Sequence, residues 1–192
     1  MNNYLTDNLL PLVLQIESKK TESYLLMAAG LGDKVSQNGV LIQLGNQLEI
    51  FWNKVISDCS VNLIQESNRI DVNGRERQLD HLFAKSGSIH YLESKCNLNF
   101  DSEKNPASNQ KVLDVKEAVQ KMYNLPVQFG YFVPCIAEVP NNVIKRYGKK
   151  GITVHGVNWM IDTLGNVPFT ADEFFTFFQD VVGPIISEML DN

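Results

Sequence analysis

Two carboxylates and one ammonium lie close together in a short part of the sequence. Asp80 lies in an apolar run at 77–83, and Glu93 and Lys95 lie in a second run at 89–96. Because alternate side chains of a strand point to the same face, Glu93 and Lys95 are expected to share one. If the two runs pair as a hairpin, Asp80 is brought beside that face. Such a group is suited to holding a hard divalent cation and activating a water molecule.

The spacing of these residues is weak evidence by itself. An acidic residue two positions before a lysine also occurs at Glu17-Ser18-Lys19 and Asp114-Val115-Lys116, both in stretches with helical periodicity. Only Glu93 lies in a strand-like run with an acidic run just upstream. The alternative interpretation is a cross-strand salt bridge on an exposed sheet face, which is common and adds little stability. The hairpin alone leaves both interpretations open.

Together with the elements around it, the hairpin resembles the PD-(D/E)xK nuclease superfamily, and type II restriction endonucleases in particular. The resemblance rests mainly on residues 70–104. It implies that Asp80 and Glu93 bind Mg²⁺, with the backbone carbonyl of Ser94 as a further ligand, and that Lys95 positions the attacking water. The proline that gives the family its name is absent, because a leucine precedes Asp80.

Residues outside the hairpin are also candidates. Many members of the superfamily carry a glutamate on the helix before the strands, and Glu49 matches it here, with a solvated helix glutamate as the alternative. Asparagine and lysine side chains suit contacts to phosphates and base edges. The predicted DNA-binding residues are Asn97, Asn99, Lys104, Asn105, Ser108, Lys111, Lys145, Arg146, Lys149 and Lys150. For each of these the alternative is an ordinary surface residue.

Length and composition narrow the class of protein. The chain has 192 residues, which predicts a single domain, and the resemblance implies that this is a nuclease domain spanning 1–192. No apolar run approaches the length of a membrane span, and the N-terminus lacks the basic start of a signal peptide. The three scattered cysteines favour buried free thiols in a reducing cytoplasm. A net charge of −5 argues against binding nucleic acid through overall charge, but it does not exclude a basic cleft.

Periodicity and turn residues predict an α/β fold. The expected order is helices, a β-meander, a crossover helix, further strands and a closing helix, with breaks at Gly39 and Gly183-Pro184. This order matches a restriction-endonuclease-like core, a mixed central β-sheet flanked by helices. Helices are predicted at 4–31 (two segments), 42–57, 107–124, 142–147, 157–164 and 174–190, and strands at 61–72, 76–84, 88–97, 127–136 and 152–155.

These observations predict a Mg²⁺-dependent type II restriction endonuclease that hydrolyses double-stranded DNA at a short specific site. The resemblance implies a homodimer and a cognate methyltransferase in the same system, without implying that the two proteins touch, and no membrane partner is expected. Two alternatives stay open. One is a repair or junction-resolving nuclease of the same superfamily, and the other is a DNA-binding relative without catalytic activity.

Overall fold

The computed structural model describes residues 2–17, 20–21, 34–35, 37–59, 62–63, 69–72, 74–96, 98 and 104–191. The chain forms two compact units. The first comprises Met1–Phe51 and Pro168–Asn192, and the second comprises Trp52–Val167. Among the described helices, none is long and apolar enough to span a lipid bilayer.

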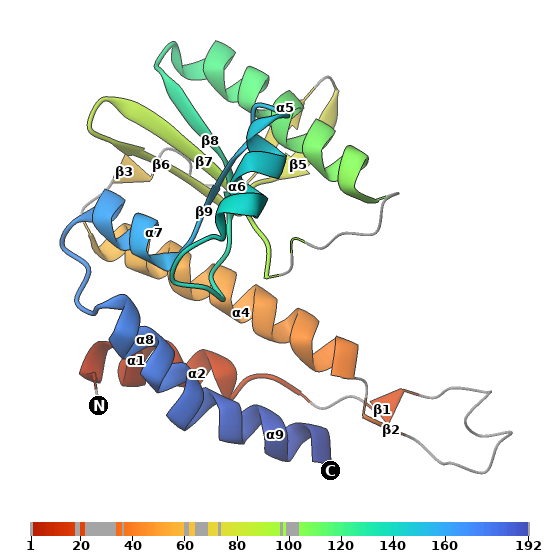
Figure 1. Cartoon of the computed structure of the whole chain (residues 1–192), viewed down its shortest axis with the longest axis vertical. Helices are drawn as coiled ribbons and strands as arrows, with labels where there is room; N and C mark the ends of the chain where they lie inside the picture. Colours follow the sequence, from red (N-terminus) through yellow and green to blue (C-terminus); the bar gives the residue numbers. More distant parts are fainter. Residues whose placement is uncertain are drawn as a thin grey trace, which may run out of the picture. The chain divides into compact units, whose positions relative to one another are not determined.

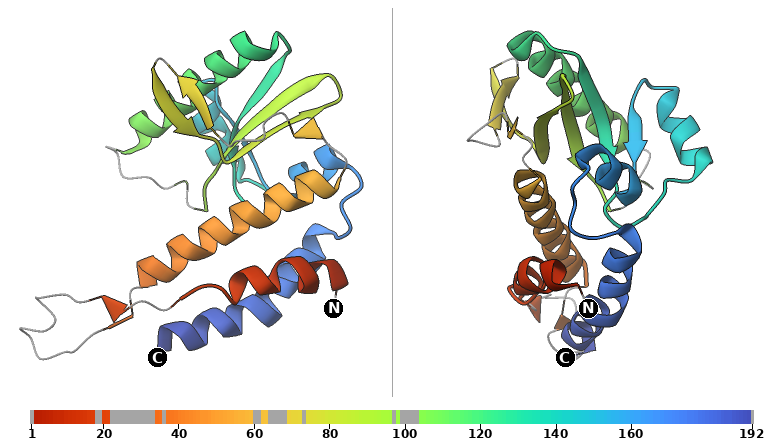
Figure 2. Two further views of the ribbon diagram at one scale, coloured as in Figure 1. Left: turned by 180° about the vertical axis from the view of Figure 1, so that it is seen from behind. Right: turned by 90° about the vertical axis from the view of Figure 1, so that its left-hand side faces the viewer.

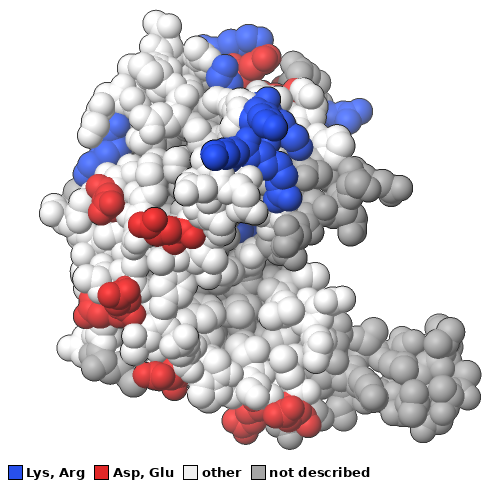
Figure 3. Space-filling view, in the orientation of Figure 1, with Lys and Arg blue, Asp and Glu red and all other residues white. Residues whose placement is uncertain are grey.

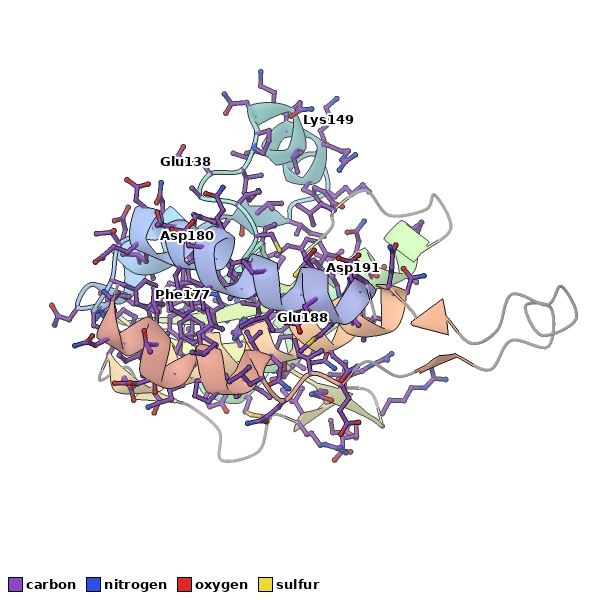
Figure 4. The ribbon with its side chains drawn as sticks, turned by 90° about the horizontal axis from the view of Figure 1, so that it is seen from below. Glu138, Lys149, Phe177, Asp180, Glu188 and Asp191 are labelled. Atoms are coloured by element: carbon purple, nitrogen blue, oxygen red, sulfur yellow. The ribbon has the colours of Figure 1, made fainter. Side chains whose placement is uncertain are left out.

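The first unit is built mainly of helices. Its elements are α1 (Asn3–Asn8), α2 (Leu10–Val13), β1 (Lys20–Thr21), β2 (Lys34–Val35), most of α4 (Gln37–Asp58), α8 (Ala171–Phe177), the π-helix η1 (Phe178–Val182) and α9 (Gly183–Asp191). Phe51 stacks on Phe174 with ring centroids 6.0 Å apart, and the ring of Tyr4 meets Phe51 edge-on at 6.3 Å. Asp180, Glu188 and Asp191 lie along η1 and α9 (Figure 4).

Side-chain caps fix the ends of two of these helices. The Asn2 side chain accepts hydrogen bonds from the backbone N–H groups of Tyr4 and Leu5 at the start of α1. At the start of α8, Thr170 and Glu173 form the reciprocal capping box that their spacing predicts. The caps provide acceptors for amides that have no partner inside a helix.

The second unit contains a five-stranded mixed sheet in the order β3-β6-β7-β8-β9 (Figure 1). Strands β3 (Asn62–Leu63), β6 (His81–Lys85) and β7 (Ser88–Ser94) are antiparallel, whereas β8 (Val127–Phe132) and β9 (Thr153–His155) continue parallel to β7. A separate hairpin joins β4 (Arg69–Val72) to β5 (Arg75–Gln78). The remaining helices are α5 (Lys104–Tyr123), α6 (Asn141–Gly148) and α7 (Val157–Leu164). The predicted α/β class with a mixed sheet flanked by helices is therefore confirmed.

Each face of this sheet has its own apolar cover. Val112, Val115 and Val119 of α5 are buried in one cluster with Tyr91 and Tyr131 of the sheet, and Figure 2 shows α5 lying along the strands. On the opposite face the ring of Trp52, from the end of α4, meets Phe132 edge-on at 5.1 Å. Because successive side chains of β7 and β8 point to opposite faces, they pack alternately on these two sides of the sheet.

The structure corrects several boundaries. Gly39 lies inside α4 rather than at a break before it, and the next residue, Val40, is already buried. The predicted strand 76–84 is interrupted at Leu79-Asp80, so Asp80 lies at a bend between β5 and β6. Met122 continues the helical spacing of Val112, Val115 and Val119, which predicts that it is buried with them, but it is exposed. A π-helical turn precedes the expected kink at Gly183. The second predicted helix, at 21–31, lies outside the described residues apart from Thr21.

Candidate active site

A tight turn sets the register of the hairpin that carries the site. Lys85 pairs with Ser88, and both residues of the loop between them, Ser86 and Gly87, have positive φ angles of 50° and 77°. This combination is typical of turns that match the natural twist of a hairpin. The register then pairs His81 with Leu92, so the next positions outward are Asp80 and Glu93. The turn therefore places the two predicted carboxylates at one end of the sheet.

Asp80 is held by its neighbours on both sides. The backbone N–H of Ser94 donates to Asp80 Oδ2 at 2.7 Å, and the Asn53 side chain donates to the Asp80 carbonyl at 2.9 Å. The Asn53 amide oxygen in turn lies 2.8 Å from Nδ1 of His81. These bonds fix the bend between β5 and β6, and with it the direction of the Asp80 carboxylate.

Glu93 is the most enclosed acidic group of the site, with 5% of the residue exposed. The Lys111 ammonium, from α5, donates to both of its carboxylate oxygens at 2.8 Å. The Lys95 ammonium lies 3.2 Å from Oε1, and the Tyr91 hydroxyl donates to Oε2 at 3.3 Å. A buried carboxylate needs such partners because isolated charges are costly to bury.

Burial and the neighbouring carboxylate shift the pKa values of groups in the site. Burial, followed by repulsion from Glu93, raises the pKa of Asp80 to about 6, although the Ser94 N–H and the two lysines act in the opposite direction. Burial and the nearby Glu93 also raise the pKa of Tyr91, so its hydroxyl stays protonated as a donor. The raised pKa of Asp80 therefore reflects its burial first and its closeness to a second carboxylate next, a combination that is common at functional sites.

The oxygen donors of the site fit a hard divalent cation. The carboxylates of Asp80 and Glu93 and the carbonyl of Ser94 are the ligand type that Mg²⁺ prefers, with waters completing its shell. Such a cation would also relieve the repulsion that raises the Asp80 pKa. In the described part of the chain, no cluster of three or more His, Cys, Asp or Glu side chains offers a richer metal site.

The other predicted residues are distributed differently. Ser108 lies half-buried on α5, and Lys111 contacts Glu93 rather than an open surface. Asn97 and Asn99 lie outside the described residues, as do the side chains of Lys104 and Asn105 in the first turn of α5. Glu49 is half-buried in the part of α4 that belongs to the first unit, so its catalytic role stays a prediction.

The four remaining candidates form one exposed group on and after α6, which we call the basic surface. Figure 3 shows basic side chains gathered on the face that carries this helix, and Figure 4 labels one of them, Lys149. The members are Lys145, Arg146, Lys149 and Lys150. The guanidinium of Arg146 donates to the backbone carbonyl of Leu98, which follows Lys95 by three positions. The basic surface is thus bonded to the segment that leaves the site.

Sequence reasoning missed several residues of the site. Alternation from Glu93 back to Tyr91 could have placed this hydroxyl on the same face. Asn53 and Asn109 carry no comparable signal, because their roles depend on contacts between distant elements. All three cysteines are free, as expected, but only Cys59 is buried, whereas Cys96 and Cys135 are exposed.

Comparison with known proteins gives only distant similarities. No protein-family model and no curated protein matches the chain. Can2 from Sulfobacillus thermosulfidooxidans, solved in complex with cyclic tetra-adenylate, is 14% identical with a TM-score of 0.43, over 88% of this chain and 52% of that protein. VC1899 from Vibrio cholerae is also 14% identical, with a TM-score of 0.41, over 79% and 41% of the two chains. The chain spans about half the length of these proteins or less.

Proposed function

We propose that this chain is a Mg²⁺-dependent nuclease that hydrolyses phosphodiester bonds in double-stranded DNA. The observation that carries the proposal is the position of Asp80 and Glu93 at one end of the β6-β7 hairpin, with two lysine ammoniums at Glu93. Carboxylates that bind a cation, beside ammoniums that can meet a phosphate, are the groups this hydrolysis requires.

Asp80, Glu93 and the Ser94 carbonyl would hold the cation. When bound, Mg²⁺ lowers the pKa of a coordinated water and offsets charge on the phosphate. The Ser94 N–H and the Asn53 amide keep Asp80 in place without occupying all of its acceptor capacity. The Lys95 ammonium, about a third exposed, orients the attacking water and donates to the phosphate oxygens, whose negative charge increases during the attack.

The basic surface gives the substrate a second attachment. Lys145, Arg146, Lys149 and Lys150 are exposed on a chain whose net charge is −5, so positive charge is concentrated there. Backbone phosphates are the ligands such a surface attracts, in a salt-dependent and sequence-independent way. We further propose that cleavage is specific for a short site, as in a type II restriction enzyme. This part of the proposal includes a homodimer and a partner methyltransferase.

One observation favours a second candidate, a DNA-binding relative without activity. Both carboxylate oxygens of Glu93 already accept hydrogen bonds from Lys111, so the same contacts also describe a buried salt-bridge network. In that case the basic surface would bind DNA and the carboxylates would only stabilise the fold.

Digestion of unmethylated phage DNA, with Mg²⁺ and with chelator, separates these functions. Discrete Mg²⁺-dependent fragments support the site-specific endonuclease, and sequencing their ends gives the recognition site. A smear indicates a nuclease without strict specificity, as expected of a repair enzyme. DNA that is bound and remains uncut with Mg²⁺ or Mn²⁺ supports the inactive relative and contradicts the nuclease.

A further inference from the structure

Tyr147 lies beneath the basic surface and has no exposed area. Its hydroxyl donates to the carbonyl of Leu98 at 3.1 Å, and the Arg146 guanidinium donates to the same oxygen at 3.1 Å. Leu98 is itself 8% exposed. Two donors on one buried carbonyl hold the segment that follows Lys95 more firmly than either donor would alone.

Two cations of the basic surface lie over the same ring. The Arg146 guanidinium is 5.2 Å and the Lys150 ammonium 5.6 Å from the centroid of Tyr147. Cation–π contacts favour each position, although the two like charges repel each other. Both cations are thereby held at the ring of one buried residue, and a phosphate is the ligand that such cations attract.

Tyr147 also packs on residues that lie close to the carboxylates. Its ring meets that of Tyr131 edge-on at 5.4 Å, and Tyr131 pairs in register with Glu93 on the adjacent strand. The Tyr131 hydroxyl donates to the Asn109 side chain at 3.1 Å, on α5 two positions before Lys111. Asn109 is 6% exposed. Packed, hydrogen-bonded contacts therefore run from the basic surface to Lys111 and Glu93.

We propose that Tyr147 is a positioning residue that joins a phosphate-binding surface on α6 to the carboxylate site. The ligand of this surface is a backbone phosphate of the bound duplex, away from the bond that is cut. Tyr147 touches neither substrate nor reacting atoms. It holds Leu98, and through it the exit of β7, at a fixed position relative to that phosphate, because supporting contacts of this kind keep reactive groups in productive geometry. The proposal rests on the nuclease function.

The test is Tyr147→Phe, which removes one oxygen and keeps the ring. Arg146 still donates to Leu98, so we expect Tm to stay within about 4 °C of wild type. We expect kcat to fall about tenfold and KM to change less than about twofold, because orientation is lost while the phosphate contacts remain. Tyr123→Phe, the same substitution at a half-buried tyrosine at the end of α5, should leave both constants unchanged.

An unchanged kcat in Tyr147→Phe would overturn the proposal, as would a loss of kcat that matches the loss of folded protein. If the surface binds phosphates, Lys149→Ala should give the opposite pattern to Tyr147→Phe. We expect its KM to rise and the salt dependence of KM to weaken. If KM and its salt dependence are unchanged in Lys149→Ala, the surface does not bind phosphates and the proposal is wrong.

A measurement that needs no cleavage keeps this result separate from the nuclease function. With chelator present, a duplex of about 20 base pairs is added and the amide resonance of Lys95 is followed by NMR. We expect a shift in wild type that is at least halved in Tyr147→Phe. Equal shifts in both proteins, or no binding of the duplex, contradict the positioning role even if the wild type cuts DNA. If the expected shifts are seen but DNA is not cut, the nuclease function alone fails.

Discussion

The Lys111 ammonium lies 2.8 Å from each carboxylate oxygen of Glu93, although the two residues are 18 positions apart in the chain. With Lys95 at 3.2 Å, two ammoniums share one buried carboxylate. Lys111 therefore lies at the carboxylates rather than on an open surface, and any contact it makes to DNA would be at the proposed site. It also holds a position that a bound cation would compete for.

Removal of the Lys111 ammonium should affect both catalysis and metal binding. We expect Lys111→Ala to lower the cleavage rate about 10²–10³-fold, because one donor to the developing phosphate charge is lost. The Mg²⁺ concentration for half-maximal activity should fall, since Lys111 no longer competes for Glu93. The free energy of unfolding should fall by about 1–3 kcal/mol, because Glu93 loses one partner. The loss is limited since Lys95 remains beside this buried carboxylate.

Rates measured against Mg²⁺ concentration, with urea unfolding, check these effects of Lys111→Ala. Lys121→Ala, at an exposed lysine of the last turn of α5, is the matched control and should behave as wild type. A Lys111→Ala enzyme that cuts at the wild-type rate would return Lys111 to a structural role.

The three central residues should be needed for cleavage but not for DNA binding. Asp80→Asn, Glu93→Gln and Lys95→Ala each remove a group expected to act on the cation or the attacking water, so we expect rates at least about 10³-fold lower. Binding of duplex DNA, measured by fluorescence anisotropy in chelator, should stay within about threefold, because the basic surface is intact in each variant. Near-normal cleavage by any folded variant of the three means that the site is assigned to the wrong residues.

Asp80 should lower the stability of the metal-free protein. Its pKa is raised to about 6 by burial and by Glu93, so the ionised carboxylate is less favourable in the folded state than in the unfolded one. We expect Asp80→Asn to increase the free energy of unfolding in chelator at pH 8 by about 1–2 kcal/mol, after allowing for the partial exposure of the group. Asp162→Asn, at an exposed aspartate of α7, should have almost no effect.

Mg²⁺ should reverse that order of stability. At a concentration 100 times its Kd, the cation is expected to stabilise the wild type by about 2.7 kcal/mol and Asp80→Asn by much less. Thermal unfolding with Mg²⁺ and with chelator measures both effects. Equal Mg²⁺ stabilisation of the two proteins would show that the cation binds elsewhere.

Acid should destabilise the protein partly through His155. Burial, and secondly the neighbouring His90, lower its pKa from 6.5 to about 4. Between these values the unfolded chain binds more protons than the folded one, so stability decreases as the pH falls through this window. From pH 8 to pH 5, the stability of His155→Gln relative to wild type should rise by about 1 to 2 kcal/mol, because the half-buried ring is partly screened.

Urea unfolding at several pH values tests this prediction for His155. His81, whose pKa is also lowered by burial, is present in both proteins, so its contribution cancels in the difference. If the two stability curves run parallel across this pH range, His155 does not titrate as the structure indicates.

The sequence by itself determined the features that depend on neighbouring residues. The stripe from Leu48 to Ile56 predicts the buried side of α4, and Thr170 with Glu173 predicts the start of α8. The pairing of two strand-like runs around residues 85–88 predicts the hairpin and brings Asp80 to Glu93. Side-chain periodicity and turn geometry are local properties, so one sequence contains enough information to predict them.

Only the tertiary structure decided which distant groups complete the site. Nothing near Glu93 in the sequence indicates that its second ammonium comes from α5, or that Tyr147 of α6 supports Leu98. Asp80 lies at a bend rather than within a strand because Asn53 and the Ser94 amide bind it there. These contacts follow from the packing of helices on the sheet, which depends on the shape and burial of the whole second unit rather than on local patterns.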